Sequence, residues 1–490
     1  MSTCSPKLEA SLKTPDVSAI FVDLDGTLIS TDLLHEALIH AVADDFRNLF
    51  RIPRWAVAGP LTLKNELSQR VQPTHELPYV HELLQFLREE RDRGVKIVLA
   101  TASHRDWAIP VAAELRLFDG VLATNAETNL KGLAKLAAIQ KWCDGKGCDQ
   151  WAYVGDDTCD LPIWDAASVA YAVNRRPKVI RRLKQLKEPK CIFPSVRPNC
   201  HQLLISLRPH HWVKNALLFI PLLASHQFNN PDLLLLASLA FLAFSATASS
   251  IYQINDLLDL DADRRHPLKR QRPLASGALP VSRVPVLVTL LGTIALGAAW
   301  LLPWNFLAIL MVYAAANVLY SFWLKTKPII DVILLACLFT LRVIAGGTAT
   351  GIVLSEWLLA FSMFIFTSLA FAKRHAELSR LRRESRKVAH GRGYQVGDLE
   401  LLETLGVTSG YMAVLVMALY AQSPSSQSMY QSPKILWLMC PLILYWVSRL
   451  WLIARRGLLL EDPVVFAFRD RISLAILGIA IVILLAATKL

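Results

Sequence analysis

Four carboxylates stand together at the end of a long apolar run. The run extends from about residue 231 to 254, which is long enough to cross a bilayer as a helix, and Asp256, Asp259, Asp261 and Asp263 follow it. A spacing of three and then four residues puts Asp256, Asp259 and Asp263 on one helix face. Carboxylates beside a membrane are costly when unpaired, and Mg²⁺ binds such oxygens together with substrate phosphates. The stretch therefore predicts a magnesium site, whereas the alternative is a solvated, charged helix end.

Basic side chains follow these acids. Lys269, Arg270 and Arg272 lie within a turn or two of Asp263. Acids that hold a metal and bases that hold anions, at the mouth of a membrane helix, indicate a phosphorylated or pyrophosphorylated substrate beside a lipid.

A second pair of carboxylates lies near the start of the chain. Asp23 and Asp25, followed by Gly26 and Thr27, come directly after the short apolar run 19–22. This pattern resembles motif one of the haloacid-dehalogenase superfamily. The resemblance implies that Asp23 attacks phosphorus and forms an aspartyl phosphate, while Asp25 protonates the leaving oxygen and later activates water.

The other motifs of that superfamily follow in order. Thr101 ends the apolar run 96–100, Lys131 lies in an Asn-Leu-Lys-Gly sequence, and Asp156 and Asp160 follow the run 151–154. By resemblance, Thr101 binds phosphoryl oxygens and Lys131 neutralises the nucleophile and the phosphate. Asp156, with Asp23 and Asp25, binds Mg²⁺, and Asp160 supports it. A degenerate, non-catalytic domain is the alternative.

The elements that would position these groups are those of an α/β domain. Strands alternating with helices predict a Rossmann-like parallel sheet, with the site at the carboxyl ends of the strands. A helical segment, about residues 31–88, separates the first two motifs, and we expect it to form a small helical cap over the site.

Composition divides the chain into a soluble and a membrane part. Of the 490 residues 53% are hydrophobic and 19% are charged, and long apolar runs begin near residue 206. We therefore expect an α/β domain over 1–205 and an all-α polytopic membrane domain over 206–490.

A basic stretch from Arg175 to Lys190 precedes the membrane part and suits the anionic headgroups of lipids. The polar first twenty residues do not resemble a signal peptide. The eight cysteines show no Cys-x-x-Cys pair, so reduced thiols are expected.

About nine apolar runs have the length of a membrane span. They cover about 211–227, 232–255, 282–302, 304–323, 329–350, 356–373, 403–422, 435–454 and 472–488. Lysine and arginine crowd the loops after the second, fourth, sixth and eighth runs. The positive-inside rule then places these loops and the α/β domain in the cytoplasm, and the C-terminus on the far side. The net charge of +12 is explained by these loops, so no nucleic-acid partner is expected.

Further polar residues lie on the same predicted face of the membrane part. They are Lys214, Tyr320, Lys325, Asp331, Lys373 and Arg374. Asp331 opens the fifth run and requires Mg²⁺ or a lysine as its partner. Arg342 lies deeper in the same run, where snorkelling fails, so we expect it to pair with an acid or a phosphate.

These motifs resemble the UbiA family of intramembrane prenyltransferases. The resemblance rests on Asn255 and the aspartate-rich stretch, followed by Arg-Pro-Leu-Ala-Ser-Gly at 272–277. Members that prenylate aromatic rings usually carry a second aspartate-rich motif after the sixth helix, where this chain has bases and Glu377. The stretches 208–215, 263–270 and 320–325, with Asp331, Arg342 and 373–378, resemble instead the decaprenyl-phosphate phosphoribosyltransferases of the family.

The resemblance implies transfer of 5-phosphoribose from phosphoribosyl pyrophosphate to a polyprenyl (decaprenyl) phosphate at the cytoplasmic membrane. Mg²⁺ would be held by Asp256, Asp259, Asp263 and Asp331. Substrate groups would be positioned by Lys214, Asn255, Lys269, Arg270, Tyr320, Lys325, Arg342, Lys373 and Arg374. The N-terminal domain would dephosphorylate the product, a precursor of lipid-linked pentose for cell-envelope glycans. Aromatic prenyl transfer, a non-enzymatic scaffold and a transporter are the rival readings, and the oligomeric state is left open.

Overall fold

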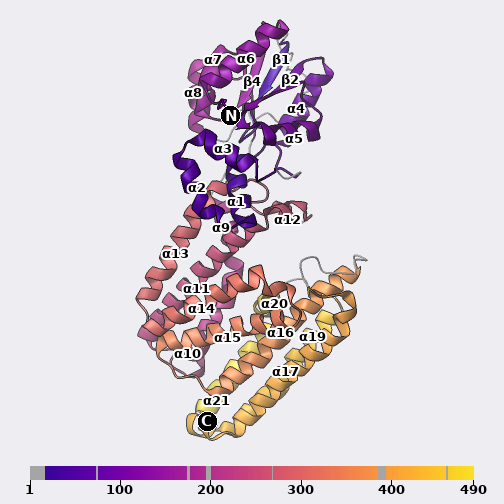
Figure 1. Ribbon diagram of the computed structural model, residues 1–490. Coiled ribbons are helices and arrows are strands. Elements are labelled where there is room, and N and C mark those ends of the chain that lie inside the picture. The colour runs from indigo at the N-terminus through magenta and orange to yellow at the C-terminus, as the bar shows by residue number, and fades with distance from the viewer. Residues whose placement is uncertain are drawn as a thin grey trace. The chain divides into compact units, whose positions relative to one another are not determined.

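Two compact units make up the chain. The computed structural model describes residues 17–72, 76–173, 177–194, 200–267, 269–383, 393–459 and 462–489. Unit 1 comprises Met1–Leu207 and Gln253–Leu287, and unit 2 comprises Arg208–Tyr252 and Val288–Leu490 (Figure 1). The sequence predicts one boundary near residue 205. The structure instead assigns residues 253–287, which include the aspartate-rich stretch, to the unit that holds the α/β domain.

A six-stranded parallel sheet forms the centre of unit 1, in the order β3-β2-β1-β4-β5-β6. The strands are β1 (Ala19–Val22), β2 (Lys96–His104), β3 (Gly120–Thr124), β4 (Trp151–Gly155), β5 (Val169–Val173) and β6 (Cys191–Phe193). All four residues of β1 are fully buried, because helices cover both faces of the sheet, as is usual for parallel sheets. The predicted parallel sheet and its strands at 19–22, 96–100 and 151–154 are confirmed.

Helices pack on the two faces of this sheet (Figure 1). One face is covered by α4 (His81–Asp92) and α5 (Arg105–Leu115), and the other by α6 (Leu133–Lys146), α7 (Leu161–Ala166) and α8 (Pro177–Leu186). The alternation along β1 explains the two cores, since Ile20 joins the first and Phe21 the second. The start of the predicted basic stretch, Arg175 and Arg176, lies outside the described residues.

The predicted helical insert consists of α1 (Leu33–Asp44), α2 (Asn48–Val57) and α3 (Pro60–Ser68). Asp32 caps α1 by accepting hydrogen bonds from the N–H groups of Leu34 and His35. The insert ends before residue 81 rather than near 88, because α4 packs on β2 and belongs to the sheet domain.

The segment 253–287 packs on the first insert helix. It contains the end of α11 (Pro231–Leu258), α12 (Leu260–Arg265), two short 3₁₀ turns (Lys269–Gln271 and Val281–Arg283) and the start of α13 (Val284–Trp300). Arg264 of α12 forms a buried, bidentate ion pair with Glu36 of α1, with Nη1 3.0 Å from Oε2. This pair joins a segment from the apolar part of the sequence to the α/β domain.

Unit 2 is all-helical. Besides most of α11 and α13 it contains a 3₁₀ helix (Pro209–Phe219), α10 (Ile220–Ala224), α14 (Trp304–Phe322), α15 (Ile330–Thr350), α16 (Glu356–Arg383), α17 (Leu399–Gln422), α18 (Pro424–Met429), α19 (Met439–Arg455), α20 (Pro463–Arg469) and α21 (Arg471–Lys489). The short helix α9 (Cys200–Ser206) belongs to unit 1. Small residues let α17 approach its neighbours: a Cβ on Gly406 would lie 2.1 Å from the Trp451 ring.

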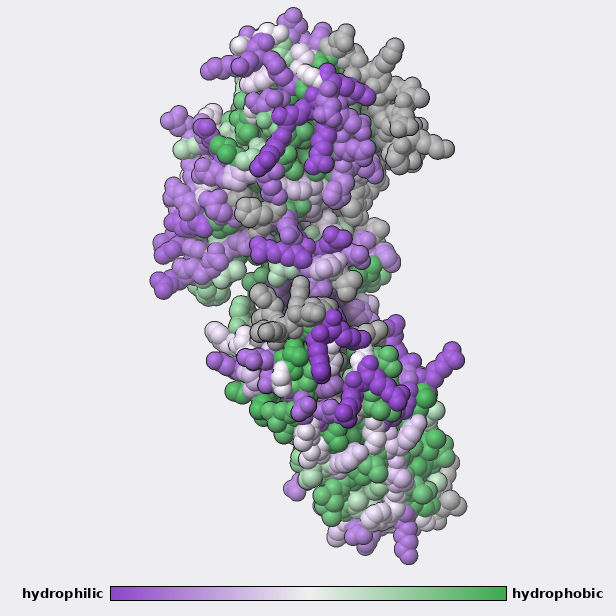
Figure 2. All heavy atoms as spheres, turned by 90° about the vertical axis from the view of Figure 1, so that its right-hand side faces the viewer, coloured by the Kyte–Doolittle hydropathy of each residue, from purple (hydrophilic) through white to green (hydrophobic). Residues whose placement is uncertain are grey.

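Eight helices within the described residues are long and apolar enough to cross a membrane. They are Pro231–Leu258, Val281–Trp300, Trp304–Phe322, Ile330–Thr350, Glu356–Arg383, Val396–Gln422, Pro433–Arg455 and Arg471–Thr488. Apolar side chains (green) form much of the visible surface of unit 2 in Figure 2, and Trp304 is 75% exposed. Eight of the nine predicted spans are thus confirmed. The first, 211–227, is not among these eight helices: it is a 3₁₀ helix followed directly by the short α10.

Candidate functional sites

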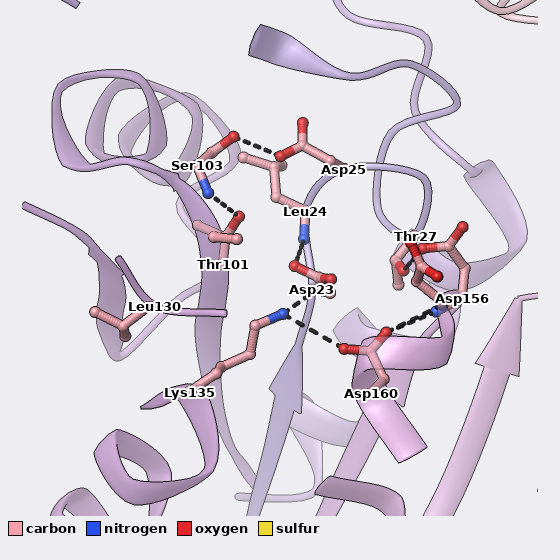
Figure 3. A network of polar contacts seen from close by, with 12 residues as sticks. Asp23, Leu24, Asp25, Thr27, Thr101, Ser103, Leu130, Lys135, Asp156 and Asp160 are labelled. Carbon is pink, nitrogen blue, oxygen red and sulfur yellow. Dashed lines mark hydrogen bonds and ion pairs between the residues drawn. The ribbon is translucent and has the colours of Figure 1, made fainter. Parts of the chain in front are cut away.

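Three buried carboxylates meet at the carboxyl ends of the central strands of unit 1. Asp23 follows β1, Asp156 follows β4, and Asp160 ends a 3₁₀ turn (Figure 3). Each offers an oxygen within 4.8 Å of the others, and together they form the one such acidic group found within the described residues. Carboxylate oxygens at this spacing suit Mg²⁺. The structure therefore brings together Asp23, Asp156 and Asp160 as the motif order predicts.

Lys135 lies between two of these acids. Its Nζ is 2.9 Å from Asp23 Oδ2 and 3.5 Å from Asp160 Oδ1, and it is 1% exposed. Three carboxylates and one ammonium leave two negative charges, which a divalent cation would balance.

The residue predicted for this position, Lys131, is exposed and lies at the cavity wall. Lys135 therefore replaces Lys131 as the candidate to neutralise the nucleophile. The sequence contains a sign of this role, because Lys135 is the one charged residue in the otherwise apolar start of a helix (Leu-Ala-Lys-Leu-Ala-Ala).

Asp23 and Asp25 have different pKa values because their surroundings differ. Burial raises the pKa of Asp23 to about 6, against the opposing charge of Lys135. Burial, reinforced by the negative charge of Asp32, raises the pKa of Asp25 to about 8. Burial alone would lower the pKa of Lys135, but the carboxylates of Asp23 and Asp160 hold it above its usual value. An ionised Asp23 beside a protonated Asp25 gives a nucleophile and a general acid.

Asp25 is held apart from the acidic group. It accepts hydrogen bonds from the Ser103 hydroxyl and from the Leu33 N–H at 2.8 Å (Figure 3). Within the described residues, the carboxylates that lie close enough to share a metal ion are Asp23, Asp156 and Asp160, and the ligand set of Asp23, Asp25 and Asp156 stays a prediction. Thr101 is fully buried, and its hydroxyl accepts a hydrogen bond from the Ser103 N–H at 3.0 Å. Ser103, rather than Thr101, lines the cavity.

A cavity of about 480 Å³ opens beside this centre. Its wall includes Asp23, Asp25, Ser103 and Lys135, residues of the helical insert such as Lys64, and the segment Pro280–Arg283. Lys64 of α3 is buried, and its Nζ donates to the Ala102 carbonyl at 2.6 Å and to Asn129 Oδ1 at 2.9 Å. Burial lowers the pKa of this lysine.

The aspartate-rich stretch keeps its helical register but meets an arginine. The Asp259 N–H donates to the Asn255 carbonyl at 2.9 Å, and the Asp263 N–H donates to the Asp259 carbonyl at 2.8 Å. Arg272 Nη1 contacts Asp256 Oδ1 at 3.1 Å and also Asp263 Oδ2.

Asp256 and Asp263 therefore share a face, as the spacing predicts, and their cation in this structure is Arg272. Lys269 lies 3.6 Å from Asp263. Asp259 and Asn255 are half-buried, and Arg270 is exposed.

Unit 2 holds two lysines on one carboxylate, with a buried arginine nearby. Asp462 Oδ2 accepts from Lys214 Nζ at 2.7 Å and from Lys373 Nζ at 2.9 Å. Arg342 is 6% exposed, and its partners are neutral: Asn215 Oδ1, the Leu338 carbonyl and the Tyr313 hydroxyl.

Lys214 and Arg342 both lie over the Phe339 ring, at 5.8 and 5.3 Å from its centroid. Three cations and one acid leave two positive charges, which a phosphoryl dianion would balance. Asp462 is not among the residues predicted from the sequence. Its signal was an acid before Pro463, in the basic loop after the eighth predicted span.

A second network in unit 2 is internally satisfied. Arg374 Nε donates to Asp331 Oδ2 at 2.6 Å, Nη1 to Glu377 at 2.7 Å and Nη2 to the Tyr320 hydroxyl at 2.6 Å. The Tyr394 hydroxyl donates to the other Asp331 oxygen at 2.6 Å. Asp331 therefore pairs with an arginine in this structure, while its role as a Mg²⁺ ligand stays a prediction. Through these contacts Arg374 and Tyr320 join α14, α15 and α16. Lys325 is half-buried in a 3₁₀ turn.

Comparison with known families agrees with this division. The profile of the UbiA prenyltransferase family matches residues 216–470, over half of the chain. The chain belongs to the UbiA prenyltransferase family. Its N-terminal part is a haloacid dehalogenase-like hydrolase domain, whose profile matches residues 20–164. This UbiA-family protein is thus a multi-pass membrane enzyme fused to a hydrolase domain.

Three relatives extend this result. The y4nM protein of Sinorhizobium fredii is 35% identical over 93% of this chain and 88% of its own length. The nodulation protein NoeC of Azorhizobium caulinodans is 39% identical over 56% of this chain and 89% of its own length. The decaprenyl-phosphate phosphoribosyltransferase of Mycobacterium tuberculosis is 37% identical over 35% of this chain and 59% of its own length.

Proposed function

We propose that the membrane part transfers 5-phosphoribose from phosphoribosyl pyrophosphate to a polyprenyl phosphate. The observation that carries this proposal is the pairing of Lys214 and Lys373 with Asp462, together with Arg342, which lies over the same Phe339 ring as Lys214; these four groups leave two positive charges, which suit phosphoryl groups. The 37% identity to a decaprenyl-phosphate phosphoribosyltransferase supports the choice of sugar donor and lipid acceptor.

The transfer itself needs no strong base. A phosphate oxygen of the lipid bonds to C1 of the ribose while the bond from C1 to the pyrophosphate oxygen breaks, and pyrophosphate leaves. Because the attacking phosphate is already anionic, the enzyme only has to orient it and to stabilise the leaving group. Lys214, Lys373 and Arg342 are the groups we assign to the phosphates.

Magnesium fits the aspartate-rich stretch by its donor atoms. Asp256, Asp259 and Asp263 are the carboxylates that would hold the ion, and bound Mg²⁺ would stabilise negative charge on the pyrophosphate. Arg272 neutralises Asp256 and Asp263 in the structure and is the residue with which a metal competes. Asn255, Lys269 and Arg270 flank this stretch and are assigned to the same substrate.

The hydrolase domain would remove the 5-phosphate of the lipid product. Asp23 attacks the phosphorus, the bond to the ribose oxygen breaks, and Asp25 supplies the proton to that oxygen. Water, deprotonated by Asp25, then releases inorganic phosphate from the aspartyl phosphate. Asp156 and Asp160, with Asp23, would hold Mg²⁺, and Lys135 neutralises the attacking and attacked groups.

The hydrolase domain is assigned to the cytoplasmic side of the membrane. The basic loops support this assignment by the positive-inside rule. The 3₁₀ helix Pro209–Phe219 and α10 precede the eight candidate spans. At rises of about 2.0 and 1.5 Å per residue they extend roughly 30 Å, the thickness of a bilayer core, and would make the first crossing.

The test uses purified protein in detergent with Mg²⁺, a polyprenyl phosphate and radiolabelled phosphoribosyl pyrophosphate. We expect label in the lipid phase, and its loss in Asp256→Ala. Absence of label, together with activity on a polyprenyl pyrophosphate and an aromatic acid, would replace the phosphoribosyl assignment by aromatic prenyl transfer. Phosphate release from the labelled lipid that does not depend on Asp23 would exclude the assigned role of the hydrolase domain.

A further inference from the structure

The cavity of the hydrolase domain has a wall that the hydrolase sequence does not supply. Pro280, Val281, Ser282 and Arg283 line it, and they lie in the part of the chain that matches the UbiA family. The hydrolase profile matches residues 20–164. A substrate in this cavity therefore contacts residues of both families.

This wall is held firmly against the domain. Val281 and Val284 are buried, and Arg264 of the same segment forms its buried ion pair with Glu36. Gly277 has a φ of +74°, and a Cβ there would lie 2.6 Å from Ser30 Cβ. The backbone on either side of Arg283 is thus fixed, so its side chain is presented to the cavity from a defined position.

The cavity is lined by four cations, Lys64, Lys131, Lys135 and Arg283, as well as by the carboxylates of Asp23, Asp25, Asp32, Asp156 and Asp157. Lys135 already serves the phosphoryl group that would lie at Asp23. Lys64 comes from the helical insert, Lys131 from the loop before α6 and Arg283 from the added wall. Lys64 has only neutral partners, and Lys131 and Arg283 form no ion pair with the part of the chain that the structure describes.

Lys64, Lys131 and Arg283 reach the cavity from three segments and offer charged donors for a second anionic group of a ligand. We infer that Arg283 binds a second anionic phosphoryl group of the hydrolase substrate, which carries a phosphomonoester at Asp23 and a second phosphoryl group toward the wall 280–283.

A cavity of about 480 Å³ accommodates such a molecule, since pockets of roughly 300–1,000 Å³ hold whole small ligands. This inference rests on the proposed phosphatase activity, and the lipid phosphodiester of 5-phosphoribose belongs to the substrate class that it names.

The experiment compares three compounds with the full-length protein in detergent and Mg²⁺. They are ribose 5-phosphate, ribose 1,5-bisphosphate, and a farnesyl phosphodiester of 5-phosphoribose. The readout is inorganic phosphate, given as the ratio of kcat/KM for each two-phosphoryl compound to that for ribose 5-phosphate. We expect Arg283→Ala to lower this ratio about 10- to 100-fold, the factor for losing one charge-assisted hydrogen bond. Arg181→Ala, an exposed arginine of α8, is the matched control and should keep the wild-type ratio.

The outcomes separate this inference from the proposed function. If Arg283→Ala leaves this ratio of kcat/KM values unchanged, Arg283 does not bind a second phosphoryl group. A fall for the farnesyl compound alone assigns the second group to a lipid phosphodiester, and a fall for both two-phosphoryl compounds assigns it to the phosphoryl group itself. If the wild type releases no phosphate from any compound, the phosphatase proposal fails. Calorimetric binding of the bisphosphate, with a tenfold or greater weakening in Arg283→Ala, then still decides the subsite.

Discussion

The two polar centres of this chain have opposite charge surpluses. In unit 1, Asp23, Asp156 and Asp160 surround one lysine, which leaves two negative charges. In unit 2, Lys214 and Lys373 contact Asp462 and Arg342 shares the Phe339 ring with Lys214, which leaves two positive charges among the four groups. Because buried charge requires compensation, the first centre calls for a divalent cation and the second for a phosphoryl dianion. One chain thus combines an acidic with a basic centre; under the proposed function the first would act on phosphorus and the second would hold phosphates.

The largest expected effect comes from the nucleophile of the first centre. Asp23→Asn keeps the shape of the side chain but removes the attacking oxyanion, so phosphate release should fall by at least about 10⁴-fold. Transfer of labelled phosphoribose to lipid should persist in the same preparation. Asp144→Asn, an exposed position on α6, is the control. Equal loss of both activities would show that the two centres do not work separately.

The two lysines near Asp23 provide the next comparison. Lys135→Met removes the buried ammonium 2.9 Å from Asp23, and phosphate release should fall about 10²- to 10³-fold, as for loss of one stabilising donor. Lys131→Met removes an exposed charge at the cavity wall and should cost less than about tenfold. A larger loss from Lys131 than from Lys135 would restore the assignment made from the motif.

The sequence alone was sufficient to predict which side chains meet where these follow adjacent parallel strands. Asp23 and Asp156 end apolar runs, and adjacent parallel strands then bring them together. It failed where a partner comes from a distant segment. Nothing local shows that Asp462 would pair with Lys214, 248 residues away. The motif also predicts Lys131 as the lysine beside Asp23, whereas the structure places Lys135, in the first turn of α6, next to this carboxylate.

The ion pair between Arg264 and Glu36 tests the junction within unit 1. Both side chains are about 95% buried, so Glu36→Gln removes the carboxylate that balances a buried guanidinium, which costs about 3–5 kcal/mol. Amide hydrogen exchange within residues 253–287 should accelerate accordingly. The double variant Glu36→Leu with Arg264→Met removes both charges and should recover most of the protection. No change in exchange for Glu36→Gln would mean that the pair does not hold this segment.

The smallest predicted effect concerns the phosphate cluster of unit 2. Lys214→Ala removes one of the two lysines bound to Asp462, so the surplus falls from two positive charges to one. Transfer of phosphoribose to lipid should fall about 10- to 100-fold, the factor for one charge-assisted hydrogen bond. The loss should appear mainly in the KM for a phosphorylated substrate. Lys434→Ala, an exposed lysine outside the cluster, should change neither constant.

The variant Asp462→Asn distinguishes a phosphate site from a structural ion cluster. It raises the surplus to three positive charges, so a phosphate site should bind its anion at least as tightly as the wild type does. A cluster that only stabilises the fold would instead lose stability in both Lys214→Ala and Asp462→Asn, with substrate affinity unchanged in the folded fraction. The two variants therefore move affinity in opposite directions only if the surplus charge of unit 2 serves a phosphate.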